Sequence, residues 1–507
     1  MPPVEGGPTS REAQLEERVR QLEAMVERLA NQVNQVNAIP RIPPLPDPYQ
    51  GPRPAPLPGD TASRETGTPA TLAVPSSMGG PAAPGQSMPP NPPPSPKYNS
   101  PATLDSIKAN VKFGPGFEIR TEDEEYILQF HNLTQIDYRG YLQGGQNPVH
   151  DTFTIPRQWW MFSGRLGKPF GYFVSFANGF DNLTMLDVFA EIDYDPRARL
   201  RLGRMKTPFT YEFFVEPVQG LILPERSIFF NNFGQNRDVG GMLYGRLFDN
   251  HLDYAVGLWN GFRNGFIDNN DGKAVSAYLN YMPFRNSEGS IFQNLDIGGS
   301  VFAEHLANPP VPQTFRTIVP TVGNSVAGVE FLRLNNNVRE QGFAGLWDAH
   351  MAYFYRGLAV IGEYAAGRQN YALTNNLDQR TSVGVQSFYV EWGWLLTGET
   401  RSGLGLVKPN SPFDPRPSKF GIGAWELTGR VEHLDIGKNV FTGGFADPNL
   451  WANRVETFSL GFNWHLTQYL KMYFMWEHAV FNDPVLFAPG RFQETSDLFL
   501  ARLQVYF

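Results

Sequence analysis

The clearest pattern in this 507-residue chain is a repeated alternation of apolar and polar side chains over segments of about ten residues. Between residues 457 and 466, Phe458, Leu460, Phe462, Trp464 and Leu466 alternate with polar or small residues. Successive side chains of a β-strand point to opposite faces, so each segment predicts a strand with one apolar and one polar face. An aromatic, apolar face opposite a charged one is typical of a wall between lipid and an aqueous lumen. We therefore predict an all-β fold, a transmembrane antiparallel β-barrel of about 16 strands over residues 107–507.

The connections between these segments differ in length in a regular way. Short turns at one end and long loops at the other are typical of outer-membrane barrels. Segment 397–421 is an exception, because it is long and Pro-rich on the side where turns should be short. We predict long loops at about residues 207–236, 261–272, 305–345, 367–380 and 436–453.

One of these loops is the strongest candidate for a functional element. The preceding strand begins Arg-Leu-Arg-Leu at residue 199, which places two arginines on one face and two leucines on the other. After Gly203 the alternation slips, as at a β-bulge, and Pro208 ends the strand. The loop that follows, 207–236, is rich in Phe and Gly, and ordered loops of this length are usually functional. We interpret it as a constriction loop folded into the pore.

The first hundred residues differ from the rest of the chain in sequence pattern and composition. Residues 1–38 contain heptads that predict a coiled-coil helix, and a solvated helix packed on its own domain is the alternative. Residues 39–106 are rich in Pro, Gly and Ser, with 19 of the 43 prolines between Pro40 and Pro96, and predict an extended linker. The apolar heptad positions are Leu15, Val19, Leu22, Val26, Leu29, Val33 and Val36.

Composition narrows the class of protein. Aromatic residues make up 14% of the chain, and no run of about 18 apolar residues predicts a membrane helix. The net charge of −8 disfavours a nucleic-acid partner, and the absence of cysteine excludes a disulfide framework. The first residues lack the features of a signal peptide, so we expect an exported protein to start upstream or this sequence to be trimmed. We assign to interface girdles Trp159, Trp160, Trp259, Trp392, Trp394, Trp425 and Trp464.

Several short motifs carry a family resemblance. Leu202-Gly-Arg-Met-Lys-Thr-Pro-Phe is followed by Pro224-Glu-Arg-Ser, and later come Leu396-Thr-Gly-Glu, Gly423-Ala-Trp-Glu-Leu and Gly461-Phe-Asn-Trp. The chain ends in an alternating strand that finishes in Phe507. Together these motifs resemble the phosphate-selective porin O/P family of Gram-negative outer membranes, over roughly residues 110–507.

The resemblance implies trimers of sixteen-stranded barrels whose third long loop, here 207–236, narrows each lumen. It places the protein in the cell outer membrane, and we expect the N-terminal region, which lies outside the resemblance, to be periplasmic. The match is weaker at the residues that would bind phosphate. The loop holds Glu212, Glu216 and Glu225 against Arg226 alone, and Phe213 stands where the family would have a lysine. Phosphate recognition requires several convergent donors.

The basic strand supplies further candidates for the solute path. The cluster is formed by Arg199, Arg201, Arg204 and Lys206. These side chains could form a positive wall that faces the acidic loop, which would set up a transverse electric field across the pore. The alternative is that its members pair with Asp187, Glu191 and Asp193 on neighbouring strands and stabilise the barrel. We assign to the constriction and solute path Arg157, Asp187, Arg199, Arg201, Arg204, Lys206, Glu212, Glu216, Glu225, Arg226, Arg237 and Arg316.

These patterns predict an outer-membrane porin for passive diffusion of small hydrophilic or anionic solutes, with phosphate-type anions as one candidate. No sequence motif indicates an enzyme, a cofactor or a metal site. The expected partners are outer-membrane lipid, other copies of the chain in a trimer, the solutes and, through the coiled coil, peptidoglycan. The alternatives are a structural protein that tethers the outer membrane to the cell wall and a secreted soluble β protein.

Overall fold

The computed structural model describes residues 109–507, apart from residues 143, 147–148, 180–181, 262, 269 and 319–327. The coiled coil predicted for 1–38 and the linker predicted for 39–106 lie outside the described residues. Among the described residues, no helix is both long enough and apolar enough to cross a membrane.

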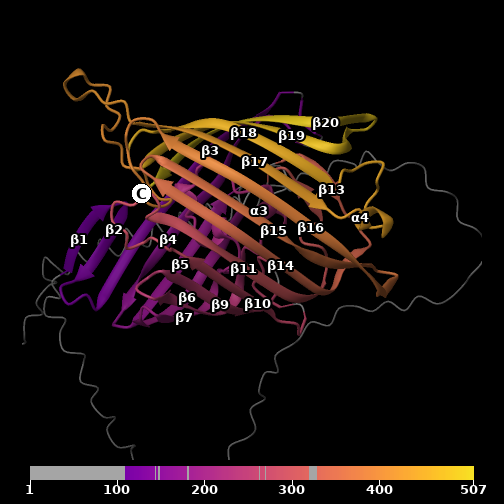
Figure 1. Cartoon of the computed structure of the whole chain (residues 1–507), viewed down its shortest axis with the longest axis horizontal. Coiled ribbons are helices and arrows are strands. Elements are labelled where there is room, and N and C mark those ends of the chain that lie inside the picture. The colour runs from indigo at the N-terminus through magenta and orange to yellow at the C-terminus, as the bar shows by residue number, and fades with distance from the viewer. Residues whose placement is uncertain are drawn as a thin grey trace, which may run out of the picture. The chain divides into compact units, whose positions relative to one another are not determined.

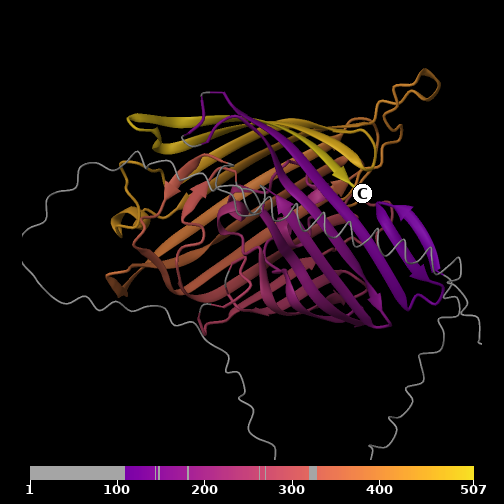
Figure 2. The same ribbon diagram turned by 180° about the vertical axis from the view of Figure 1, so that it is seen from behind.

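One antiparallel sheet of 18 strands dominates the described part of the chain. Two of these strands, β1 (Ala109–Gly114) and β2 (Gly116–Thr121), form a hairpin, and the remaining 16 form the barrel wall. The wall closes because the last strand pairs with the first, from Leu498 opposite Tyr141 to Tyr506 opposite Leu133. Figure 2 shows the purple first strands of the wall beside the yellow last ones.

The wall strands are long and tilted, as Figure 1 shows. They are β3 (Tyr126–Tyr141), β4 (Thr152–Leu166), β5 (Phe170–Gly179), β6 (Asn182–Asp195), β7 (Ala198–Lys206), β8 (Arg237–Leu247), β9 (Leu252–Trp259), β10 (Ala274–Tyr281), β11 (Asn294–Asn308), β14 (Val338–Tyr355), β15 (Leu358–Leu373), β16 (Asn376–Leu395), β17 (Ala424–Ile436), β18 (Arg454–His465), β19 (Leu470–Ala488) and β20 (Arg491–Tyr506).

The two faces of the wall match the alternation in the sequence. In β18, Phe458, Leu460 and Phe462 are each 40% exposed, whereas Ser459 and Asn463 on the opposite face are buried. Aromatic side chains also contact one another across strands on the outer face, which adds to sheet stability. The prediction of an all-β barrel with about 16 strands is confirmed.

Most predicted loops lie where we expected, but the loop predicted at 367–380 is wrong. There β15 continues to Leu373 and β16 begins at Asn376, so the two strands form a tall hairpin. The Tyr371 side chain of this hairpin packs against Phe445, from the connection between β17 and β18, at a ring distance of 5.7 Å. This packing explains why the strands extend beyond the segment that alternation suggested.

Two other connections have structure of their own. Between β11 and β14, the short strands β12 (Thr314–Arg316) and β13 (Glu330–Arg333) pair with each other. Between β17 and β18 lies the short helix α4 (Asn439–Thr442). The connection between β16 and β17 contains the 3-10 turn η2 (Pro417–Lys419), and it projects from the end of the barrel that carries the C terminus (Figure 1).

Candidate functional site

The loop 207–236, between β7 and β8, lies inside the barrel. Its two ends meet where the Thr207 N–H donates to the carbonyl of Asn236 at 3.0 Å. Between them the chain forms the short helix α2 (Tyr211–Phe214), the 3-10 turn η1 (Val218–Gly220) and the helix α3 (Ile228–Phe233). Most of its side chains are buried, and Figure 1 shows α3 within the wall. This placement is what the sequence predicted for a loop folded into the pore.

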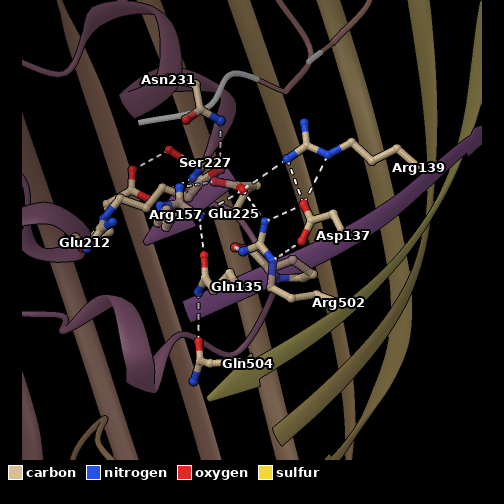
Figure 3. A network of polar contacts seen from close by, with 12 residues as sticks. Gln135, Asp137, Arg139, Arg157, Glu212, Glu225, Ser227, Asn231, Arg502 and Gln504 are labelled. Carbon is tan, nitrogen blue, oxygen red and sulfur yellow. Dashed lines mark hydrogen bonds and ion pairs between the residues drawn. The ribbon is translucent and has the colours of Figure 1, made fainter. Parts of the chain in front are cut away.

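Three arginines of the wall converge on one carboxylate of the loop (Figure 3). Arg157 donates two hydrogen bonds to Glu225, at 3.0 and 2.6 Å, and Arg502 donates one at 2.6 Å. A terminal nitrogen of Arg139 lies 3.6 Å from the same carboxylate. Because bidentate and charge-assisted hydrogen bonds are the strong ones, this contact fixes the position of the loop.

A second carboxylate completes this cluster. Asp137 accepts hydrogen bonds from Arg502 at 2.6 and 2.8 Å and from Arg139 at 3.1 and 2.8 Å. Burial by itself would raise the pKa of Glu225, but the charges of Arg157 and Arg502 outweigh burial and hold that pKa below its ordinary value. The guanidinium groups are therefore already engaged by carboxylates of the protein.

The wall also holds the backbone of the loop. The carboxylate of Glu363 accepts the N–H groups of Tyr211 and Glu212, at 3.0 and 2.6 Å, and Glu432 accepts that of Ile228 at 2.8 Å. A basic side chain of the wall, Arg430, donates to the backbone carbonyl of Glu225 at 2.8 Å. Each end of the loop is thus bound to side chains from distant strands, and the middle of the bore is occupied by the loop.

The acidic residues of the loop lie in different environments. Glu212 accepts the N–H of Ser227 at 2.8 Å, so it is bound within the loop. Burial, and then the nearby carboxylates of Glu391 and Glu212, hold the pKa of Glu216 well above its ordinary value. The loop therefore presents Glu225 to arginines and Glu216 to other acids.

Two predicted basic residues bind the loop backbone. Lys206 donates to the carbonyl of Phe213 at 2.8 Å. Arg226 donates to the carbonyls of Glu212 and Glu216 at 2.8 and 2.9 Å, and its guanidinium lies 5.4 Å from the Phe213 ring centroid. Both residues therefore shape the turn between α2 and η1.

Two arginines of β7, Arg199 and Arg201, are paired with acids of the neighbouring strand β6. Arg199 donates to Asp193 at 2.7 Å, and Arg201 donates to Glu191. These are the pairings expected if the cluster stabilises the barrel. Neither contact involves the loop.

Arg204 has a different environment from the other basic residues of β7. It is opposite Val188, whose side chain is exposed on the outer face, and directly paired residues of a sheet share a face. Its guanidinium donates to the carbonyls of Asn264 and Gly265, at 3.0 and 3.2 Å. The structure thus places Arg204 away from the bore.

The last two predicted residues, Arg237 and Arg316, form ion pairs beside the loop. Arg237 donates to Asp187 at 2.9 Å. Arg316 forms an ion pair with Glu330 in the β12–β13 hairpin, and its backbone N–H donates to Asn232 of α3 at 2.9 Å. Arg316 thus links that hairpin to the loop.

Cavities remain between the loop and the wall. One of about 300 Å³ lies against β4–β8 and is lined by Asp187, Arg201, Lys206 and Arg237, among others. Two more, of about 480 and 420 Å³, lie between the loop and residues 399–408 of the long β16–β17 connection. Beside Phe233, on the other part of the loop, the space narrows to about 10 Å³. The loop thus leaves open space beside β4–β8 and beside residues 399–408, and it fills the bore near Phe233.

The sequence itself decides the family. Residues 131–507 match the family model described as phosphate-selective porin O and P. The chain belongs to the phosphate-selective porin O/P family. It is therefore an outer-membrane porin, a non-enzymatic channel.

Comparison with solved structures finds other barrels at low identity. OmpT of Vibrio cholerae in its trimer form is 8% identical, with a TM-score of 0.43 and coverage of 75% of this chain and 99% of that one. OmpF of Salmonella typhi is 13% identical, with a TM-score of 0.44 and coverage of 77% and 100%. The channel DcaP of Acinetobacter baumannii is 8% identical, with a TM-score of 0.45 and coverage of 76% and 99%. No curated protein matches the porin.

Some residues of this site were not identified from the sequence of the porin. Asp137, Arg139, Glu363, Arg430 and Glu432 all hold the loop or its partners, yet they are spread over 295 positions between Asp137 and Glu432. In the sequence, the only feature that marked these residues was their place in alternating strands, which puts their side chains on the inner face.

Two tryptophans correct the assignment to the girdles. Trp159 is 5% exposed and lines the 300 Å³ cavity, and Trp259 is 1% exposed and donates to Ser276 at 2.8 Å. Both face the interior because their strands place these positions on the bore side.

Proposed function

We propose that this porin is a narrow channel for passive diffusion of small hydrophilic solutes, without a phosphate-binding site. The observation that supports this is the Glu225 cluster, in which Arg139, Arg157 and Arg502 are engaged by Glu225 and Asp137. A bound phosphate would have to compete with these carboxylates for the same donors.

The path that we propose follows the cavity beside β4–β8. Its lining contains the basic side chains of Arg201, Lys206 and Arg237, of which Arg201 is paired with Glu191 and Arg237 with Asp187. A low-dielectric wall focuses the field of such charges, so the path would favour small anions over cations by a modest factor. Selection would then combine size exclusion with charge, and no chemical step is involved.

Planar-bilayer recordings on the purified full chain test this proposal. With chloride as the permeant anion, we expect the reversal potential in a salt gradient to indicate a mild preference for anions. Added phosphate or sulfate should cause no saturable block of the chloride current. Phosphate block at concentrations far below that of chloride would show a binding site and contradict the proposal.

We also propose that the chain forms trimers, with residues 1–38 as a coiled coil and 39–106 as a linker. The supporting observation is the heptad pattern of the sequence. On this proposal the N-terminal region is periplasmic, and peptidoglycan is its candidate partner in a tethering role.

Deletion of residues 1–100 separates the two roles of this N-terminal region. If conductance is retained while the envelope detaches from the cell wall, the tether is supported. If trimers and conductance are both lost, the region serves channel assembly.

A further inference from the structure

The β1–β2 hairpin extends the barrel wall on one side of the C terminus. Strand β3 pairs with β20 through residues 133–141 and with β2 through residues 127–130. The backbone of Asn132, between these two regions, exchanges hydrogen bonds of 2.6 and 2.9 Å with Phe507. The hairpin therefore begins where the last strand ends, at the same rim of the barrel (Figure 1).

One face of the hairpin is apolar and continuous with the outer face of the wall. Phe113 is opposite Phe117, Phe117 is opposite Phe130, and Phe130 is opposite Phe162 of β4. The ring centroids of successive pairs lie 6.4, 5.8 and 5.1 Å apart. Phe162 is exposed on the outer face of β4, so this aromatic row runs from the barrel wall onto the hairpin.

This apolar face of the hairpin is highly exposed. Phe113 is 74% exposed and Val111 is 58% exposed, and Ile119 and Leu128 continue the apolar surface across β2 and β3. Contiguous exposed apolar surface of this kind marks contact with another phase or partner.

The opposite face of the hairpin is polar. Lys112 is opposite Glu118, and Glu118 is opposite Gln129. Glu118 accepts hydrogen bonds from Gln129 at 2.5 Å and from Arg120 at 2.9 Å. The hairpin is thus an amphipathic pair of strands whose apolar side has the same orientation as the lipid-facing side of the barrel.

We propose that the apolar face of the β1–β2 hairpin binds membrane lipid, at the boundary between headgroups and acyl chains on the side of the C terminus. The evidence is its continuity with the wall that already contacts lipid and the segregation of charge to the other face. Aromatic side chains are favoured at this level of a bilayer. The hairpin would therefore anchor the segment that joins residues 1–108 to the barrel.

Single cysteines can test this proposal directly, because the chain has no cysteine of its own. We would label Phe113→Cys and Val111→Cys with a nitroxide, and compare them with Asn110→Cys and Lys112→Cys on the polar face. The full-length variants are folded in lipid vesicles, and heat-modifiable migration verifies each barrel. Val256→Cys, on the exposed outer face of β9, serves as a lipid-facing reference.

The measurement is the collision of each label with oxygen, which concentrates in lipid, and with a water-soluble nickel complex. We expect oxygen to dominate at positions 111 and 113, as at position 256, and the nickel complex to dominate at 110 and 112. Nickel dominance at both 111 and 113 would place the face in water and overturn the proposal. Low collision rates with both reagents at 111 and 113 would show that protein rather than lipid covers the face, and would also overturn it.

Discussion

Two groups of arginines lie on the inner wall of this barrel, and they have different partners. Arg199 and Arg201 lie two residues apart on β7 and bind acids of the adjacent strand. Arg139, Arg157 and Arg502 come from the first, second and last wall strands and converge on Glu225 of the loop. The first group has local partners, whereas the second joins parts of the chain that are far apart.

The difference also concerns burial. The side chains of Arg199 and Arg201 are each 29% exposed, whereas that of Arg157 is 2% exposed and that of Arg502 is fully buried. Partly exposed ion pairs contribute little to stability, but breaking a buried pair leaves a charge without compensation. A dense cluster of basic residues in the sequence therefore does not mark the arginines on which the loop depends.

The largest effect is expected for Glu225→Ala. This change leaves the buried guanidinium groups with Asp137 as the remaining carboxylate of the cluster, and loss of one partner from a buried pair costs roughly 3–5 kcal/mol. We expect looser attachment of the loop, a higher single-channel conductance and a shift toward anion selectivity. Urea unfolding and planar-bilayer recordings measure these changes.

Glu122→Ala is the matched control for this variant, because Glu122 is exposed in the β2–β3 turn. It removes the same charge without touching the cluster, so its conductance should equal that of the wild type. Equal conductance and selectivity for Glu225→Ala and Glu122→Ala would show that the arginine cluster does not position the loop.

A smaller effect is expected for Lys206→Met. This variant removes the donor to the buried carbonyl of Phe213, and a buried acceptor left without its partner costs about 1–3 kcal/mol. It also removes a basic side chain from the lining of the 300 Å³ cavity. The reversal potential in a salt gradient should move toward cations, and an unchanged value would argue against a solute path along β4–β8.

The smallest effect is expected for Arg201→Ala. Its partly exposed pair with Glu191 contributes at most about 1 kcal/mol, so the midpoint of urea unfolding should change little. Because Arg201 also lines the 300 Å³ cavity, a small loss of anion preference should accompany the change. A loss of stability as large as that of Glu225→Ala would erase the distinction between the two groups of arginines.

The sequence was sufficient for the wall of the barrel. In β18, alternation alone identified the lipid-facing residues, because the strand separates an apolar phase from a polar one. The β15–β16 hairpin was harder to predict, since Tyr371 is covered by another connection that no local pattern reveals. Trp159 and Trp259 were misassigned for a related reason, because the inner face of this barrel also contains large aromatic side chains.

The site was predicted only in part. Arg157 and Glu225 were both candidates, but nothing local to either residue indicates that they meet, since they are 68 positions apart. Arg502 was not among the candidates, and its contact with Glu225 spans 277 positions. Contacts at such separations depend on closure of the barrel and on the path of the loop, which local periodicity does not specify.

The position of Arg502 has a consequence for how this protein matures. The same guanidinium binds Asp137 across the seam between the first and last wall strands and Glu225 on the internal loop. The last strand therefore contributes to both closure of the wall and attachment of the loop. A polypeptide that stops before its final strand cannot complete the cylinder, and it lacks one of the guanidinium groups that hold its internal segment.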